Sequence, residues 1–124
     1  MKFFTQLFLA LTIVLAPVSY ATAQTVKSGN LVGEKVKWTQ GSVKIVKSGS
    51  GHKIQLGSNF KTKQGPALYV YLGNGKPQKR IAKLQSISGA QSYAIPNSVN
   101  IDSYSNVYIY CVPFRVVFGS SRLR

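Results

Sequence analysis

The sequence predicts an all-β fold: an antiparallel β-sandwich or barrel-like single domain. Apolar and polar residues alternate over short segments, glycine- or proline-containing turns separate these segments, and almost no helical pattern follows residue 23. Short strands between regularly spaced turns are typical of sandwiches and barrels. The remaining length, residues 24–124, suffices for one small domain.

The first 23 residues have the pattern of a secretory signal peptide. Lys2 precedes an uncharged apolar stretch, which ends at the small-residue tripeptide Ala21-Thr22-Ala23. Polar interruptions keep the apolar core shorter than the roughly 20 residues that a membrane-spanning helix needs. We therefore expect cleavage after Ala23 and an exported chain, periplasmic or secreted, with no transmembrane span after processing. Residues 24–30 would then form a short lead into a β domain of residues 31–124.

The first half of the domain predicts hairpins with one apolar and one basic face. Apolar residues alternate with lysines over residues 36–45, and Gln40-Gly41 supplies a turn between two short strands. A second turn is expected at residues 48–51, where two glycines alternate with serines. The alternation then continues through residues 53–56, so another strand follows this turn.

The second half predicts more strongly apolar strands. Residues 67–72 are apolar on both faces, which indicates a central strand, and the glycines at 73 and 75 end it. Residues 81–87 are ambiguous. Further strands are expected at residues 91–96, where Pro96 requires an extended predecessor, and at 107–111 and 114–118, with Pro113 forcing a bulge, bend or edge position between them.

Basic residues greatly outnumber acidic ones. The chain has 16 lysines and arginines against two carboxylates, Glu34 and Asp102, which gives a formal net charge of +14. Such a surface attracts polyanions over about 8–10 Å in ordinary salt. Acidic glycans, lipid head groups and nucleic acid are therefore candidate partners. The alternative is that scattered lysines only keep a small β-domain soluble.

The inventory of reactive side chains argues against a hydrolase or a metalloenzyme. A glycosidase of the usual kind needs two carboxyl groups at a set spacing, whereas the two acids here lie in polar segments. A zinc site needs three or four ligands, whereas the chain has one histidine, His52, and one cysteine, Cys111. A nucleophile pair of these two residues would need an exposed thiol. The catalytic chemistry left to the chain is at most a redox or electron-transfer role.

Cys111 lies in the most apolar run of the sequence. An exported chain with a single cysteine cannot form an internal disulfide, so the thiol is a core residue, a partner for another molecule or a reactive group. Cys111 has the same strand parity as Val107 and Ile109. We therefore expect its side chain to face the core.

Four tyrosines occupy corresponding faces of two predicted strands. Tyr69 and Tyr71 share one face of the first strand, and Tyr108 and Tyr110 share the face of the second strand that is opposite to Cys111. If these strands are neighbours, the four rings form a cross-strand ladder. The ladder would either stabilise the sheet or offer an aromatic platform, beside basic residues, to a sugar or a planar cofactor.

Three segments, in this order, resemble the DM13 domain family. They are Gly65–Leu72 (GPALYVYL), Gly89–Pro96 (GAQSYAIP) and Tyr104–Gly119 (YSNVYIYCVPFRVVFG). The earlier segments Gly41–Ile45 and Leu56–Phe60 fit the opening strands of that family, so the resemblance covers residues 31–123.

The resemblance implies an exported β-rich module, often joined in larger proteins to extracellular cytochrome-like domains. Electron transfer through the single cysteine, bare or bearing a haem-like group, has been proposed for the family. Cys111 is then the redox candidate, Tyr108 and Tyr110 are candidate cofactor-binding or relay residues, and a redox protein is the expected partner. The alternative function is a non-catalytic envelope or matrix module that binds polyanions.

Two positions depart from the family pattern. Ala67 stands where an acidic residue usually follows Gly-Pro, and Tyr110 stands where a tryptophan often precedes the cysteine. The first departure removes a polar partner from the candidate site, and the second changes the ring next to the sulfur.

Overall fold

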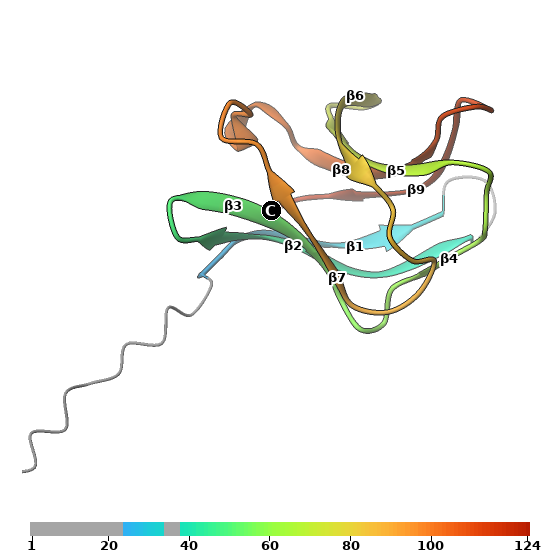
Figure 1. The fold of residues 1–124 in the computed structure, drawn as a ribbon, viewed down its shortest axis with the longest axis horizontal. Coiled ribbons are helices and arrows are strands. Elements are labelled where there is room, and N and C mark those ends of the chain that lie inside the picture. Colours follow the sequence, from blue (N-terminus) through green and yellow to red (C-terminus); the bar gives the residue numbers. More distant parts are fainter. Residues whose placement is uncertain (1–23, 34–37) are drawn as a thin grey trace, which may run out of the picture.

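The computed structural model describes residues 24–33 and 38–124, which form a nearly closed barrel of antiparallel strands (Figure 1). In these ranges no helix is long and apolar enough to cross a membrane. The elements in chain order are β1 (Gln24–Val32), β2 (Thr39–Ser48), β3 (Gly51–Leu56), β4 (Lys61–Thr62), β5 (Leu68–Gly73), β6 (Pro77–Lys83), β7 (Gln91–Ile95), the 3-10 turn η1 (Ile101–Ser103), β8 (Asn106–Cys111) and β9 (Val116–Arg122).

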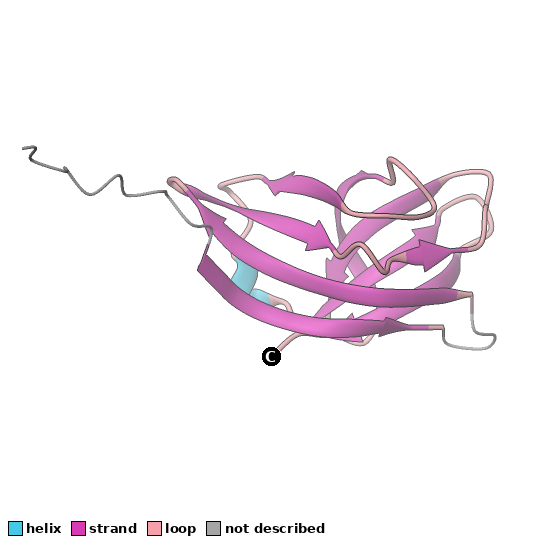
Figure 2. Ribbon diagram, turned by 90° about the horizontal axis from the view of Figure 1, so that it is seen from below, coloured by secondary structure: helices cyan, strands magenta, loops and turns pink. Residues whose placement is uncertain are grey.

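One sheet holds all nine strands. The order across it is β6-β5-β8-β9-β1-β2-β3-β7, with β4 paired to the start of β2. The long strands curve across the molecule and bring the two ends of this order towards each other (Figure 2). The all-β expectation is confirmed in its barrel-like form.

Alternate positions of the strands fill the barrel interior. Val43 and Ile45 of β2 are paired with Leu56 and Ile54 of β3, and all four side chains are at most 2 % exposed. β5 lies between β6 and β8, as its apolar sequence predicted. Burying a side chain of this size stabilises a fold by about 1.5–3 kcal/mol.

The expected turn at Gln40-Gly41 is wrong, because Gly41 lies inside β2 and is paired with Leu31 of β1. Its φ of +116° suits glycine, as a turn would require. However, the reason is the approach of another segment: a Cβ at this position would lie 2.5 Å from the Cα of Phe60. The positive φ and the missing side chain therefore admit the Phe60 backbone.

Two turn expectations hold, but strand boundaries differ: the strand expected at residues 114–118 is β9, which begins at Val116. The β2–β3 hairpin turns at Gly49, and Pro113 lies in the turn between β8 and β9, as expected. β1 includes the segment that was expected to be a lead, residues 24–30. The expected signal peptide, residues 1–23, and the first residues of the expected 36–45 hairpin lie outside the described residues, as does Glu34.

Side chains close the seam of the barrel between β6 and β7, the two end strands of the order. The backbone N–H of Gln85, just past β6, donates to Tyr93 Oη of β7 at 2.8 Å. Gln85 Nε2 also donates to the Ser92 carbonyl at 3.3 Å. Burial raises the pKa of Tyr93 above its ordinary value, and the hydrogen bond from Gln85 opposes this effect.

Tyr93→Phe is expected to weaken this seam. The Gln85 N–H loses its acceptor, so the free energy of unfolding should fall by about 1–2 kcal/mol. Because the folded-state pKa of Tyr93 is raised, its stabilising contribution is complete below the ordinary tyrosine pKa of about 10 and is lost as pH rises through the folded value. Denaturant melts at neutral and alkaline pH should show a steeper alkaline loss for the wild type. An equal loss of stability at alkaline pH in the wild type and in Tyr93→Phe would contradict this prediction. Tyr104→Phe is the control.

Candidate functional site

The four tyrosines predicted to form a ladder do lie on neighbouring strands. β5 and β8 are antiparallel neighbours, with Tyr69 opposite Tyr110 and Tyr71 opposite Tyr108. We call these four residues the tyrosine ladder. Three of the rings are half-buried, whereas Tyr108 is only 2 % exposed. The sequence predicted this arrangement on the condition that the strands pair, and the register fulfils it.

The rings of the tyrosine ladder do not form a flat platform. The Tyr71 and Tyr110 ring centroids are 5.2 Å apart and the ring planes are inclined by 76°, which is an edge-to-face contact. Such contacts are favourable because the positive edge of one ring meets the negative face of the other. The Tyr71 and Tyr110 rings therefore offer no coplanar surface on which a sugar or a planar cofactor could stack.

Arg80 of β6 covers two rings of the ladder. Its guanidinium carbon lies 4.3 Å from the Tyr69 ring centroid and 5.7 Å from that of Tyr71. Its Nε also donates a hydrogen bond to Tyr71 Oη at 2.9 Å. This hydrogen bond raises the pKa of Arg80 further above its ordinary value, so the cation persists at every working pH. The ladder thus carries a fixed positive charge at one side.

Cys111 is on the opposite face of β8, as strand parity predicted. Its side chain has no exposed area, and it is a free thiol within the hydrophobic core. Its register partners are Leu68 of β5 and Val116 of β9. The ring of Tyr110 and the sulfur of Cys111 therefore belong to consecutive residues that face the two sides of the sheet.

A haem-like group does not fit Cys111 in this structure. An axial ligand must face a space wide enough for a planar macrocycle, whereas the Cys111 side chain is fully enclosed by core residues. Cys111 lines none of the four cavities described for the molecule. Among residues 24–33 and 38–124, no group of three or more His, Cys, Asp or Glu side chains is placed to hold a metal ion.

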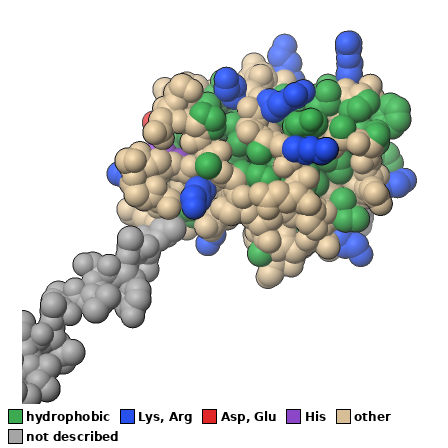
Figure 3. Space-filling model, in the orientation of Figure 1, with side chains coloured by type: hydrophobic (Ala, Val, Ile, Leu, Met, Phe, Trp, Pro, Cys, Tyr) green, Lys and Arg blue, Asp and Glu red, His purple; other side chains and the backbone are tan. Residues whose placement is uncertain are grey.

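Hydrophobic and basic side chains share one face of the molecule. Figure 3 shows lysine and arginine side chains projecting between hydrophobic ones, which gather towards the right-hand end of the view. Within the described part of the chain the single acidic side chain is Asp102, whose Oδ1 lies 3.9 Å from Lys27 Nζ. Because the basic residues greatly outnumber this one carboxylate, the charge on the described part of the chain is predominantly positive.

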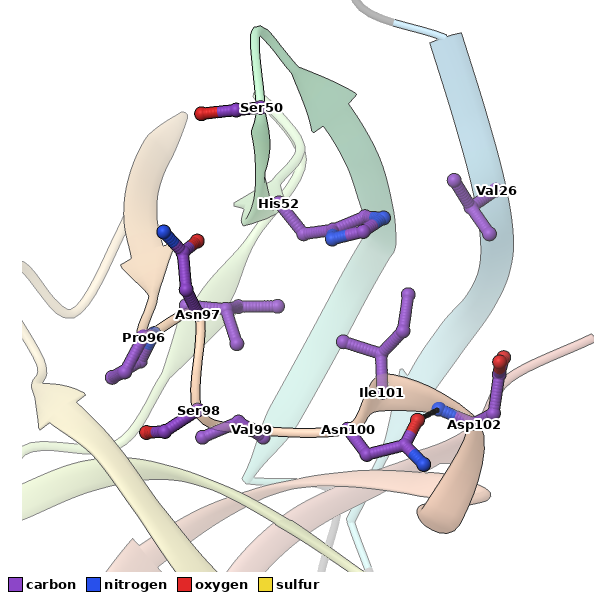
Figure 4. A pocket seen from close by; sticks show the side chains of 11 residues that line it. Val26, Ser50, His52, Pro96, Asn97, Ser98, Val99, Asn100, Ile101 and Asp102 are labelled. Atoms are coloured by element: carbon purple, nitrogen blue, oxygen red, sulfur yellow. Dashed lines mark hydrogen bonds between the residues drawn. The ribbon is translucent and has the colours of Figure 1, made fainter.

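His52 lies away from Cys111, in a cavity of ≈ 520 Å³ at the end of the barrel that carries the β2–β3 hairpin. Its ring points into this cavity towards Val26, while the Asn100 side chain turns to the backbone N–H of Asp102 (Figure 4). Cys111 does not line the cavity. The structure therefore does not bring the two residues of a Cys-His nucleophile pair together.

Arg80 was not predicted from the sequence. It lies in the run Pro77–Lys83 of the end strand β6, which is polar at most positions, shows no clean alternation and has no fully buried side chain. An edge strand need not bury either face, so periodicity gives no signal. Only the pairing of Arg80 with Tyr71 in the register of β5 and β6 identifies it.

Comparison with known proteins identifies one family. A family model described as electron transfer DM13 matches residues 30–123. No curated protein and no solved structure matches the chain. The match spans most of the sequence, includes every strand from β2 to β9, and contains both Cys111 and the tyrosine ladder. The chain belongs to the DM13 family.

Proposed function

We propose that this protein is an exported electron-transfer module in which the tyrosine ladder is the surface redox group and Cys111 is the buried one. The observation that carries the proposal is the position of Tyr110, whose ring contacts Tyr71 at the surface and whose backbone continues directly into Cys111. The family description supports the electron-transfer class. The protein partner is a one-electron donor or acceptor.

Electrostatics favours Tyr110 as the ring that is oxidised. Arg80 lies over Tyr69 and Tyr71, and a nearby fixed cation makes removal of an electron from those rings harder. Tyr110 is in contact with Tyr71 but is not one of the rings under Arg80. The fixed charge therefore favours Tyr110 over its two neighbours as the oxidised residue.

Tyr110 and Cys111 each lose one electron and one proton on oxidation and regain both on reduction. An oxidised partner takes one electron from Tyr110, whose phenolic proton passes to water. The resulting neutral radical takes an electron and a proton back as the Cys111 thiol is oxidised to a thiyl radical. A reduced partner then restores the thiol with one electron, and water supplies the proton. The net result is transfer of one electron between two partner proteins.

Photochemical one-electron oxidation of the purified protein tests this assignment. Tyr110→Phe keeps the ring and removes the phenol, so it should abolish most of the tyrosyl radical signal seen by transient absorption or electron paramagnetic resonance. Tyr104→Phe changes a half-buried tyrosine outside the ladder and should leave the signal unchanged. Arg80→Gln should raise the signal from Tyr69 and Tyr71.

The role of Cys111 is tested separately with Cys111→Ala. If the thiol reduces the Tyr110 radical, this variant should keep the initial signal and prolong its decay. Equal decay in the wild type and Cys111→Ala would remove Cys111 from the pathway. An unchanged signal in Tyr110→Phe would remove Tyr110 from the pathway.

A further inference from the structure

The turn between β8 and β9 presents an exposed aromatic ring. Phe114 is 67 % exposed and Val116 is 38 % exposed, with the exposed Arg115 between them. A phenylalanine gains about 1.5–3 kcal/mol from burial, so leaving this ring in water forgoes much of that stabilisation. The turn lies at the opposite end of the barrel from the β2–β3 hairpin (Figure 1).

The turn holds the backbone at Phe114 in a defined conformation. Pro113 precedes Phe114 and restricts the backbone, and the N–H of Arg115 donates to the Val112 carbonyl at 3.2 Å. Arg115 adopts a φ of +53°, the left-handed conformation that residues other than glycine seldom adopt. Phe114 is therefore exposed by a structured turn and not by a loose chain end.

An apolar groove adjoins the turn. Phe114, Val116 and Phe118 line it together with Trp38 and the segment Gln64–Pro66, and its volume is ≈ 300 Å³. Trp38 meets Phe118 edge to face, with ring centroids 4.9 Å apart. The groove and the exposed ring form one continuous apolar surface, which we call the turn face.

Cations rim the turn face. Lys63 lines the groove, and its Nζ lies 4.8 Å from the Trp38 ring centroid. Lys61 lines the neighbouring hollow with Trp38, and Arg115 extends from the turn itself. The acidic side chain that the structure describes, Asp102, lines the cavity that contains His52 and not the groove. The turn face thus combines an apolar centre with positive charge.

We propose that the turn face docks the protein on an anionic membrane surface. Phe114 and Val116 enter the boundary between head groups and acyl chains, and Arg115, Lys61 and Lys63 reach the lipid phosphates. Amphipathic elements with aromatic residues and flanking cations bind membranes in this manner, and each cation near the surface strengthens binding to anionic lipid. A protein interface of ordinary stability needs roughly 800 Å² of matching surface on each partner. A single projecting turn fits a fluid lipid surface better.

Vesicle binding by the exported protein tests the proposal. We expect binding to phosphatidylglycerol-containing vesicles, weaker binding to pure phosphatidylcholine vesicles, and a loss of affinity for the former of about 10-fold in Phe114→Ser. Arg115→Gln should weaken the same binding by about five-fold. Trp38 is the single tryptophan of the sequence and lies in the groove, so its emission should shift to the blue on binding.

Val26→Ser is the matched control. Val26 is 42 % exposed and lies in the cavity lined by His52, away from the turn face. Because the two serine variants keep the same N-terminus, any lipid binding by the leader is common to both. Thermal melts establish that each variant is folded.

Three outcomes would overturn membrane docking: no binding to anionic vesicles, equal binding of Phe114→Ser and the wild type, or an equal loss in Val26→Ser. A Phe114-dependent complex with an acidic protein, without vesicle binding, would assign the turn face to a protein partner. None of these outcomes bears on the radical signals of Tyr110→Phe, so the two proposals fail separately.

Discussion

Native Cys111 is expected to react with a neutral alkylating reagent at least ~1000-fold more slowly than the same thiol in the unfolded chain. The side chain has no exposed area, so the reagent reaches it only when β8 separates from its neighbours. Opening a core strand costs a large part of the free energy of unfolding, which is about 5–15 kcal/mol for small domains. The native rate should therefore track the population of the open state.

Intact-mass analysis measures this directly, because the chain contains a single cysteine and labelling adds one reagent mass. The reference is the same protein in strong denaturant. A native rate within about tenfold of the denatured rate would show that β8 opens readily. In that case Cys111 would be accessible to partner thiols, and the buried-thiol step of the proposed electron transfer would need revision.

Gly41→Ala is expected to lower the free energy of unfolding by at least about 3 kcal/mol, or Tm by more than about 10 °C. Two costs combine at this position. A φ of +116° is unfavourable for alanine, and the added Cβ would lie 2.5 Å from Cα and 2.8 Å from N of Phe60. Phe60 is 1 % exposed and cannot move without disturbing the core.

Gly75→Ala separates these two costs. Gly75 also has a positive φ, +78°, but nothing lies within 4 Å of the Cβ that alanine would add. It should therefore cost only the backbone strain, about 1 kcal/mol. Equal effects of Gly41→Ala and Gly75→Ala in denaturant melts would mean that Phe60 yields to the new methyl group.

Sequence alone predicted those parts of the fold whose pattern is local. β5, β7 and β8 bury alternating or continuous apolar residues, and period-2 alternation is visible in any window of five residues. The inward orientation of Cys111 followed from the same alternation. Glycine in a turn and glycine under a crossing backbone look the same in sequence, which is why Gly41 was misread.

The parts of the candidate site that depend on strand order could not be predicted. Tyr69 and Tyr110 are opposite each other only because β5 and β8 pair, although the two residues are 41 positions apart in the sequence, and no local pattern shows which strands are neighbours. Arg80 enters the tyrosine ladder through an end strand that has no periodicity. Similarly, the sequence did not reveal the exposure of Phe114, because Phe114, Val116 and Phe118 alternate as in a strand, whereas β9 begins only at Val116.

β6 and β7 are the two end strands of the sheet, and side chains of Gln85 and Tyr93 join them in place of a continuous set of backbone hydrogen bonds. Part of the backbone of each strand therefore has no partner strand within the molecule. An unpaired strand edge can bind the edge of a second molecule, and repeated addition of this kind produces an extended, fibre-like sheet. Here β6 begins with Pro77, which lacks a backbone donor, and carries Lys79, Arg80 and Lys83 along its length. Two molecules that approach rim to rim bring these cations together, so repulsion opposes the first step of fibre growth. Arg80 therefore both contacts the tyrosine ladder and adds to the charge that keeps the edges of two molecules apart. Its replacement should increase the tendency of concentrated protein to form fibres.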